Sequence, residues 1–292
     1  MPEAGDNVTI LDYAQAIWHQ TPGAVKTFLT AAIGALFGAW VTSRSQKKKE
    51  IVAELRALRA AQALCFAVVN KALAIKSQHV RSLKENFDSV FAAFTDYQRN
   101  PQGTFNANLD LQTLSQTTFA TPALEKTLFE KCFLGGRSIA TVVALCESAD
   151  DLKRTIDLRN ELTKEFRGKA PTGHLEKLSF YLGLPSGGGQ DTRWKDCVHA
   201  LYAQTDDCIF FGRQLGDRII EAEHALRANY RWRYRLPGKK IGPPNWDIAK
   251  KAGLIPPDSN YRDWVKGFKK ELTATERIKA RLTSLFYRVW AE

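Results

Sequence analysis

The chain has 292 residues, five cysteines and a formal net charge of +11, and 44% of its residues are hydrophobic. An odd number of widely spaced cysteines without a CxxC pair argues against a disulfide framework and suits a reducing compartment. We therefore expect all five to be small apolar residues of a helical interior: Cys65, Cys132, Cys146, Cys197 and Cys208.

An uncharged run near the N-terminus is the first element along the chain. Thr27 to Ser43 would span about 25 Å as a helix, and Lys26 and Arg44 can extend their charges to the two interfaces of a hydrocarbon core of roughly 30 Å. The alternative is the buried helix of a soluble protein, but such a helix normally carries a polar stripe stronger than a few threonines. The sequence predicts a transmembrane helix over residues 22–45, after an extracytoplasmic tail over residues 1–21.

The charges that flank this run predict its orientation. Arg44 and the lysines at 47–49 follow it, whereas Lys26 alone precedes it, so the positive-inside rule places the C-terminal side in the cytoplasm. The first 21 residues are acidic and lack Lys and Arg, unlike a cleaved signal peptide. We expect a single-pass protein of the plasma (bacterial inner) membrane with its N-terminus outside.

Small residues form a ridge along the predicted span. Gly34 and Gly38 make a GxxxG pair, which Thr30 and Thr42 extend at a spacing of four residues. Such ridges allow two helix backbones to approach closely in lipid, although small residues are also simply frequent in spans. The ridge and the spacing that follows it predict a homo-oligomer.

A long amphipathic helix is predicted over residues 46–98, continuous with the span. No proline or glycine interrupts it, and its apolar residues follow a 4-3 spacing with one slip near Lys76. The slip would weaken a simple two-stranded coiled coil, so half of the stripe is expected to pack on later helices of the same chain. The stripe consists of Ile51, Leu55, Leu58, Cys65, Val69, Ala72, Val80, Leu83, Phe87, Val90 and Phe94.

The remainder, residues 99–292, is predicted to be a cytoplasmic helical bundle. Residues 99–121 form a long surface connection, and Thr121-Pro122 starts a helix that ends at Gly135-Gly136. A second helix is expected to end near Cys146, and Ser148 to cap a third that stops at Gly168.

A glycine-rich loop precedes the last long helix of this bundle. The loop PSGGGQD, residues 185–191, lacks the Lys-Ser/Thr of a phosphate loop and is interpreted as a flexible linker. The helix is predicted over residues 193–230. The fold class is therefore all-α, without the alternating strands of α/β enzymes.

Two acid–histidine pairs have the spacing of metal ligands. Asp196 with His199 and Glu221 with His224 have the i, i+3 spacing of di-iron bundles, but both pairs lie on one predicted helix, about 37 Å apart, and cannot share a metal. Local signatures of nucleophilic catalysis, such as GxSxG, are missing. No enzymatic activity, cofactor or metal site is predicted, and a hydrolase or metal enzyme is the least favoured class.

Positive charge is concentrated in the last quarter of the chain. Residues 225–292 hold 16 Lys/Arg and 6 Asp/Glu, which accounts for ten of the eleven excess charges. Arginines interleaved with aromatic rings suit anionic lipid headgroups or single-stranded nucleic acid, although cations also favour a helix end. The candidate site consists of Arg231, Trp232, Arg233, Arg235, Lys239 and Lys240.

The C-terminal tail also carries helix signals. An N-cap is expected at Asp258 or Ser259, and Thr273 to Glu276 has the form of a capping box. An apolar stripe that begins at Trp264 and runs to Val289 is expected to pack on the domain, with insertion into the lipid surface as the alternative.

These patterns favour a membrane-anchored helical interaction protein, a scaffold or sensor-effector that acts on the cytoplasmic face with an unknown protein partner. The alternative is a tethered nucleic-acid-binding module that uses the basic C-terminal region.

Overall fold

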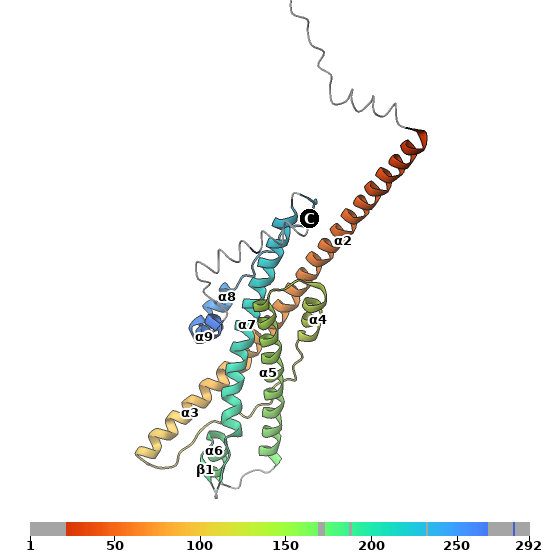
Figure 1. Cartoon of the computed structure of the whole chain (residues 1–292). Helices are drawn as coiled ribbons and strands as arrows, with labels where there is room; N and C mark the ends of the chain where they lie inside the picture. Colours follow the sequence, from red (N-terminus) through yellow and green to blue (C-terminus); the bar gives the residue numbers. More distant parts are fainter. Residues whose placement is uncertain (1–21, 169–172, 187–188, 232, 268–282, 284–292) are drawn as a thin grey trace, which may run out of the picture.

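In a computed structural model, the protein is a bundle of helices built on one long rod (Figure 1). The rod consists of α2 (Gly23–Ile75), a π-helical turn η1 (Lys76–Val80) and α3 (Arg81–Arg99), which follow one another without a break. The structure describes residues 22–168, 173–186, 189–231, 233–267 and 283. The predicted all-α class and the predicted long helix are confirmed.

The π turn explains the slip in the apolar spacing. A π turn adds one residue to the ladder of an α-helix, so side chains beyond it return to the same face. Ala72, Lys76 and Val80 are all buried although each is four residues from the next. The alternating spacing of four and three residues resumes at Leu83. Every residue of the predicted stripe is buried.

The stripe packs on other helices of the same chain. These are α4 (Thr121–Lys131), α5 (Gly136–Gly168) and α7 (Arg193–Tyr230), whose side chains share two apolar clusters with it. Gly212 of α7 meets Val69 of α2 so closely that a Cβ at Gly212 would collide with its side chain. The whole stripe is buried within the chain, whereas only half of it was expected to pack on later helices. A coiled coil with a second copy is therefore not required to cover this surface.

The predicted bounds of α7 are confirmed, but the prediction for α5 is wrong. Two helices with a break between Cys146 and Ser148 were expected, whereas one helix runs through both residues. The Ser148 hydroxyl donates to the carbonyl of Ala144 at 2.7 Å, so it bonds back along the helix and does not cap a new one. No glycine or proline interrupts the stretch, and serine alone does not end a helix.

The glycine-rich loop is more ordered than expected of a linker. It follows α6 (His174–Leu182), which ends at Gly183 in a left-handed conformation. Two short strands, β1 (Pro185–Ser186) and β2 (Gly189–Gln190), pair antiparallel on either side of residues 187–188. The side chain of Gln190 donates to the Gly183 carbonyl at 2.8 Å and fastens the hairpin to the helix end.

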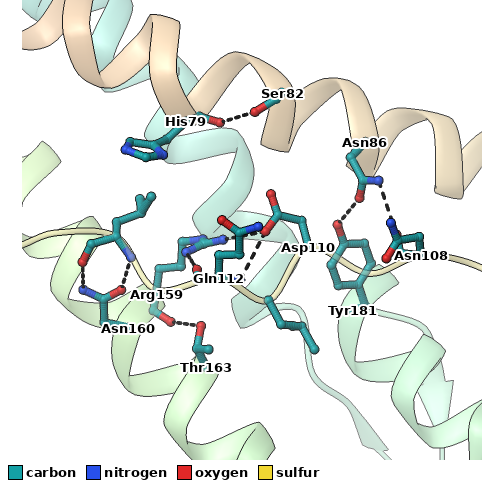
Figure 2. Close-up of polar contacts among 12 residues, drawn as sticks. His79, Ser82, Asn86, Asn108, Asp110, Gln112, Arg159, Asn160, Thr163 and Tyr181 are labelled. Atoms are coloured by element: carbon teal, nitrogen blue, oxygen red, sulfur yellow. Dashed lines mark hydrogen bonds and ion pairs between the residues drawn. The ribbon is translucent and has the colours of Figure 1, made fainter.

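Residues 100–120, which we call the connecting segment, lack helix and strand, and most of their side chains are exposed or half-buried, as expected of a surface connection; Leu114 and Thr117 are buried. Figure 2 shows Arg159 and Asn160 of α5 directed at its backbone. Arg159 donates to the carbonyl of Gln112, and the Asn160 amide bonds both the N–H and the carbonyl of Leu114 at 2.8 Å. Leu114 is buried in the core, so the segment is an integral part of the bundle.

A second irregular segment follows α7 and descends along α2. Residues 231–261, which we call the strap, include the short helices α8 (Asp247–Lys251) and η2 (Asp258–Tyr261) and lead into α9 (Arg262–Gly267). Side chains of the rod hold its backbone: Arg59 donates to Lys239, Gln62 to Gly242 at 3.1 Å, and Lys76 to Leu254 at 3.0 Å.

The lower end of the strap packs on α7. The Tyr261 ring stacks on Phe210 at 3.7 Å, and Trp264 packs edge-on against Phe211 at 5.0 Å. The expected packing on the domain is thus confirmed at Trp264. The predicted N-cap at Asp258 or Ser259 is wrong, because η2 begins at Asp258 with Pro257 at the N-cap position and has no side-chain cap. The capping box at 273–276 and the stripe beyond Trp264 lie outside the described residues.

The N-terminal part of α2 projects away from the bundle (Figure 1). Between Thr30 and Glu50 every side chain is exposed except the half-buried Ala32. By length and composition, Thr30–Arg99 is the one helix among the described residues that could cross a membrane. The tail over residues 1–21 lies outside the description.

Candidate functional site

The candidate site lies where α7 ends and the chain turns back towards α2. The N–H groups of Arg233 and Tyr234 donate to the carbonyl of Tyr230 at 3.2 and 3.0 Å, which closes the turn. Tyr234 is buried against Ile51 and Leu55 of α2, so one aromatic ring anchors the basic turn to the rod. The neighbouring arginines remain exposed because the backbone alternates between the bundle and solvent.

Arg44 joins the two basic regions of the sequence. Its guanidinium donates to the carbonyl of Arg233 at 2.9 Å and lies 5.8 Å from the centre of the Tyr234 ring. It also lies 5.3 Å from the ring of Trp40, at the end of the exposed apolar helix. Residues 189 positions apart in the sequence therefore meet at one end of the bundle.

A shallow groove of about 380 Å³ lies between the basic turn and the rod. We call it the rod groove; its lining residues are Val41, Arg44, Ser45, Lys48, Arg233, Tyr234 and Arg235. Next to it on the rod, Lys47 pairs with Glu50 at 3.2 Å, and this hydrogen bond raises the pKa of Lys47. This ammonium group is thus charged at neutral pH.

A cavity of about 440 Å³ lies on the other side of the basic turn, between it and α7. We call it the strap cavity; it is lined by His224, Arg227, Ala228, Arg231, Tyr234, Arg235, Leu236 and Lys240. No carboxylate is among these lining residues, which all belong to the described part of the chain. The cavity therefore combines several cations with an apolar wall.

One of these cations is already paired. Arg227 donates to the carboxylate of Glu223, which is fully buried, and to the carbonyls of Pro237 and Lys239 at 3.2 and 3.3 Å. His224 makes a hydrogen bond with the carbonyl of Ile241 at 3.1 Å. Arg227 and His224 thus hold the strap in place.

The sequence-predicted site residues divide between the two hollows. Arg231 and Lys240 line the strap cavity, Arg233 lines the rod groove, and Arg235 lines both. Lys239 lines neither: its carbonyl accepts hydrogen bonds from Arg59 and Arg227, and its side chain is exposed. Trp232 lies outside the described residues.

Sequence reasoning missed several residues of this site. It did not connect Arg44 and Lys48 with the turn, because nothing local records a contact over 189 positions. It also missed Arg227, although Glu223 and Arg227 stand at the i, i+4 spacing of a helical ion pair. That spacing was the available signal.

The predicted helix-association residues lie on the projecting part of α2. Gly34 and Gly38 are exposed, and a Cβ at either position would meet nothing within 4 Å. Thr42 donates to the Gly38 carbonyl at 2.8 Å, so its hydroxyl is satisfied within the helix. Thr30 is exposed on the same part of the helix.

The other chemical candidates are occupied by structural contacts. The His199 ring lies edge-on to Phe87 at 5.5 Å, and burial lowers its pKa. Burial raises the pKa of Cys65 and Cys146 to about 12, so both are thiols and not nucleophilic thiolates at neutral pH. Among the described residues, no three His, Cys, Asp or Glu side chains are grouped so as to hold a metal ion.

No protein-family model matches the sequence, and no curated protein or solved structure matches the chain.

Proposed function

We propose that the protein is a single-pass membrane-anchored helical interaction protein, a scaffold or sensor-effector that acts on the cytoplasmic face of the bacterial inner membrane. The observation that carries this proposal is the projecting part of α2, whose apolar side chains have no cover within the chain's described residues. Phe28, Leu36 and Phe37 are 73%, 71% and 64% exposed. Exposing this apolar surface to water would cost free energy, whereas a helix that crosses a bilayer needs an apolar surface towards the lipid.

The position of the basic turn supports the same orientation. The bond between Arg44 and the Arg233 carbonyl sets the turn beside the residue that follows the apolar run. Each Lys or Arg near an anionic leaflet contributes about 1 kcal/mol of attraction. The cations of the two hollows would then hold the bundle against the membrane surface.

The burial of Tyr234 favours lipid over single-stranded nucleic acid. Proteins that bind single strands stack bases on exposed aromatic rings. The Tyr234 ring is only 8% exposed, packs on Ile51 and Leu55, and lies next to the Arg44 guanidinium. It cannot stack on a base without leaving the rod.

Topology is the decisive test. A reporter active only in the cytoplasm should work when fused after Glu292 and fail when fused at Met1. Membranes washed with alkaline carbonate should retain the protein, and its full release would contradict the transmembrane assignment. A labelled single-stranded oligonucleotide at about 150 mM salt should not bind the full chain in neutral nanodiscs; tight binding would favour the nucleic-acid alternative.

Self-association through the small-residue ridge is a separate part of the proposal. Gly34→Ile with Gly38→Ile should reduce a crosslinked dimer, because the added side chains keep the two backbones apart. Ala35→Ile with Ala39→Ile is the matched control on another face of the same helix. An unchanged crosslinking ladder in the glycine variant would refute a role for the ridge.

A further inference from the structure

The strap cavity differs from a merely charged surface because its walls combine two chemistries. Arg231, Arg235 and Lys240 supply cations from the strap, and Ala228 and Leu236 supply apolar surface. Its volume of about 440 Å³ falls within the range of roughly 300–1,000 Å³ typical of small-molecule sites.

Side chains of α7 and of the rod hold the strap backbone beside the cavity. Arg227, which lines the cavity, donates to Glu223 and to two strap carbonyls, and Arg59 donates to the strap from the side of the rod. Arg235 and Lys240 therefore line a hollow beside backbone that these contacts already hold in place. Guanidinium groups in such a setting suit phosphate, which accepts two parallel N–H donors.

We propose that the strap cavity binds one phosphate group, carried by the headgroup of an anionic membrane lipid. The lipid source rests on the proposed function, because the anchor would bring the cavity to the membrane surface. Arg231, Arg235 and Lys240 contact the phosphate, and Leu236 and Ala228 contact the glycerol and the first carbons of the acyl chains. Free inorganic phosphate shares the same chemistry, and the experiment separates the two sources.

Two charge-matched double variants form the core of the test. Arg231→Gln with Lys240→Gln removes two cations from the strap cavity, and Lys48→Gln with Arg233→Gln removes two from the rod groove only. All four side chains are exposed, so both variants should fold. Native mass spectrometry of the full chain in neutral detergent, with phosphatidic acid added stepwise, counts the bound lipids.

We expect one phosphatidic acid to bind before all others and the cavity variant to weaken this binding at least tenfold. The groove variant should change it less than threefold. Ala228→Phe, which fills the cavity without a change of charge, should weaken binding as much as the cavity variant does. A helical circular dichroism signal checks the fold of each variant, and the two charge variants alone suffice if Ala228→Phe does not fold.

Equal weakening in both charge variants would overturn the proposal, because diffuse attraction depends only on total charge. Binding of phosphate-free diacylglycerol as tight as that of phosphatidic acid would overturn it as well. Competition by inorganic phosphate at the same concentration as the lipid would support the phosphate site and assign it to a free anion. These measurements in detergent do not depend on topology, so their failure and the failure of the membrane proposal are distinguishable.

Discussion

The connecting segment and the upper part of the strap, residues 233–240, are both irregular, but the first is held by the buried cation Arg159, whereas the second carries exposed cations. Arg159 of α5 is 1% exposed, lies 5.1 Å from the Trp194 ring and donates to the backbone of the connecting segment. Lys76 of the rod is 2% exposed and does the same for the lower strap. The upper strap instead carries its cations on the outside, at Arg233, Arg235 and Lys240.

The difference shows which cations can bind a ligand. A buried charge must be compensated by partners in the protein itself, and Lys76 has the Asp206 carboxylate, the Leu254 carbonyl and the Tyr202 ring at 4.9 Å. In the described part of the chain, no ion pair joins Arg235 or Lys240 to a carboxylate. The first kind of cation stabilises the fold, and the second is open to a partner.

The largest expected effect comes from breaking the buried pair in the rod. Lys76→Met keeps the length of the side chain but leaves Asp206 without its counter-charge, which should lower the free energy of unfolding by about 3–5 kcal/mol. Urea unfolding of the full chain in mild detergent measures this loss. Lys84→Met removes an exposed pair with Asp88 on α3 and should cost less than about 1 kcal/mol.

The double variant Lys76→Met with Asp206→Leu should recover most of the lost stability, because no charge then remains buried. A double variant as unstable as Lys76→Met would show that the hydrogen bond to Leu254, and not the unpaired carboxylate, dominates the loss.

Arg159 provides the matching test for the connecting segment. Arg159→Leu leaves the Gln112 carbonyl without its donor and removes the partner of Asp110 at 3.7 Å, so we expect a loss of about 2–3 kcal/mol. Arg154→Leu on the same helix breaks an exposed pair with Asp151 and should cost under about 1 kcal/mol. Equal losses in the two variants would contradict the contrast between buried and exposed cations.

A pH dependence is expected where the lower strap meets α7. Burial raises the pKa of Asp207, and the hydrogen bond donated by Tyr261 at 2.7 Å offsets only part of this shift. The folded state therefore binds more protons than the unfolded state between the unfolded pKa, near 3.8, and the higher folded value. In that window the contribution of Asp207 to stability falls as pH rises.

Asp207→Asn removes this titration while its side-chain oxygen can still accept the Tyr261 hydroxyl. Relative to the unmodified chain, the variant should therefore gain stability as pH is raised from about 4 to 7. Urea midpoints at each pH measure the difference. Asp217 also has a pKa raised by burial, but it titrates in both proteins and cancels. The Asp207 charge adds to the burial that raises the pKa of Asp206, so its removal lowers that pKa and changes the difference in the same direction. A difference that stays constant with pH would rule out the buried titration of Asp207.

The helices were predictable from the sequence because their signals are local. The slip in the apolar spacing near Lys76 marks the π turn, and the extent of α7 follows from apolar residues that recur at helical spacing. The wrong division of α5 arose because Ser148 can either cap a helix or bond back within one, and only packing decides between the two.

The two irregular segments were not predictable in the same way. The burial of Leu114 depends on Asn160, 46 positions away, and the docking of the basic turn depends on Arg44, 189 positions away. Irregular backbone has no periodicity that could show which side faces the core. The sequence therefore indicated the exposed arginines of the candidate site but neither of the hollows that they line.

The smallest expected effect compares one glycine of each irregular segment. Gly103 in the connecting segment and Gly238 in the strap both have positive φ, +67° and +82°, so an alanine at either position should cost about 1 kcal/mol in backbone strain. At Gly103 a Cβ would meet nothing within 4 Å, whereas at Gly238 it would lie 2.7 Å from the Arg59 guanidinium. The flexible Arg59 side chain can move aside, but it then loses its hydrogen bond to the Lys239 carbonyl.

Gly238→Ala should therefore cost about 1 kcal/mol more than Gly103→Ala in urea unfolding, the net contribution of one hydrogen bond. Adding Arg59→Ala to both variants should abolish the difference, because neither alanine then has a neighbour to displace. If the difference persists without Arg59, its origin is backbone strain in the strap alone. In that case the hydrogen bond from Arg59 would not stabilise the upper strap, and other contacts would have to hold the backbone beside the strap cavity.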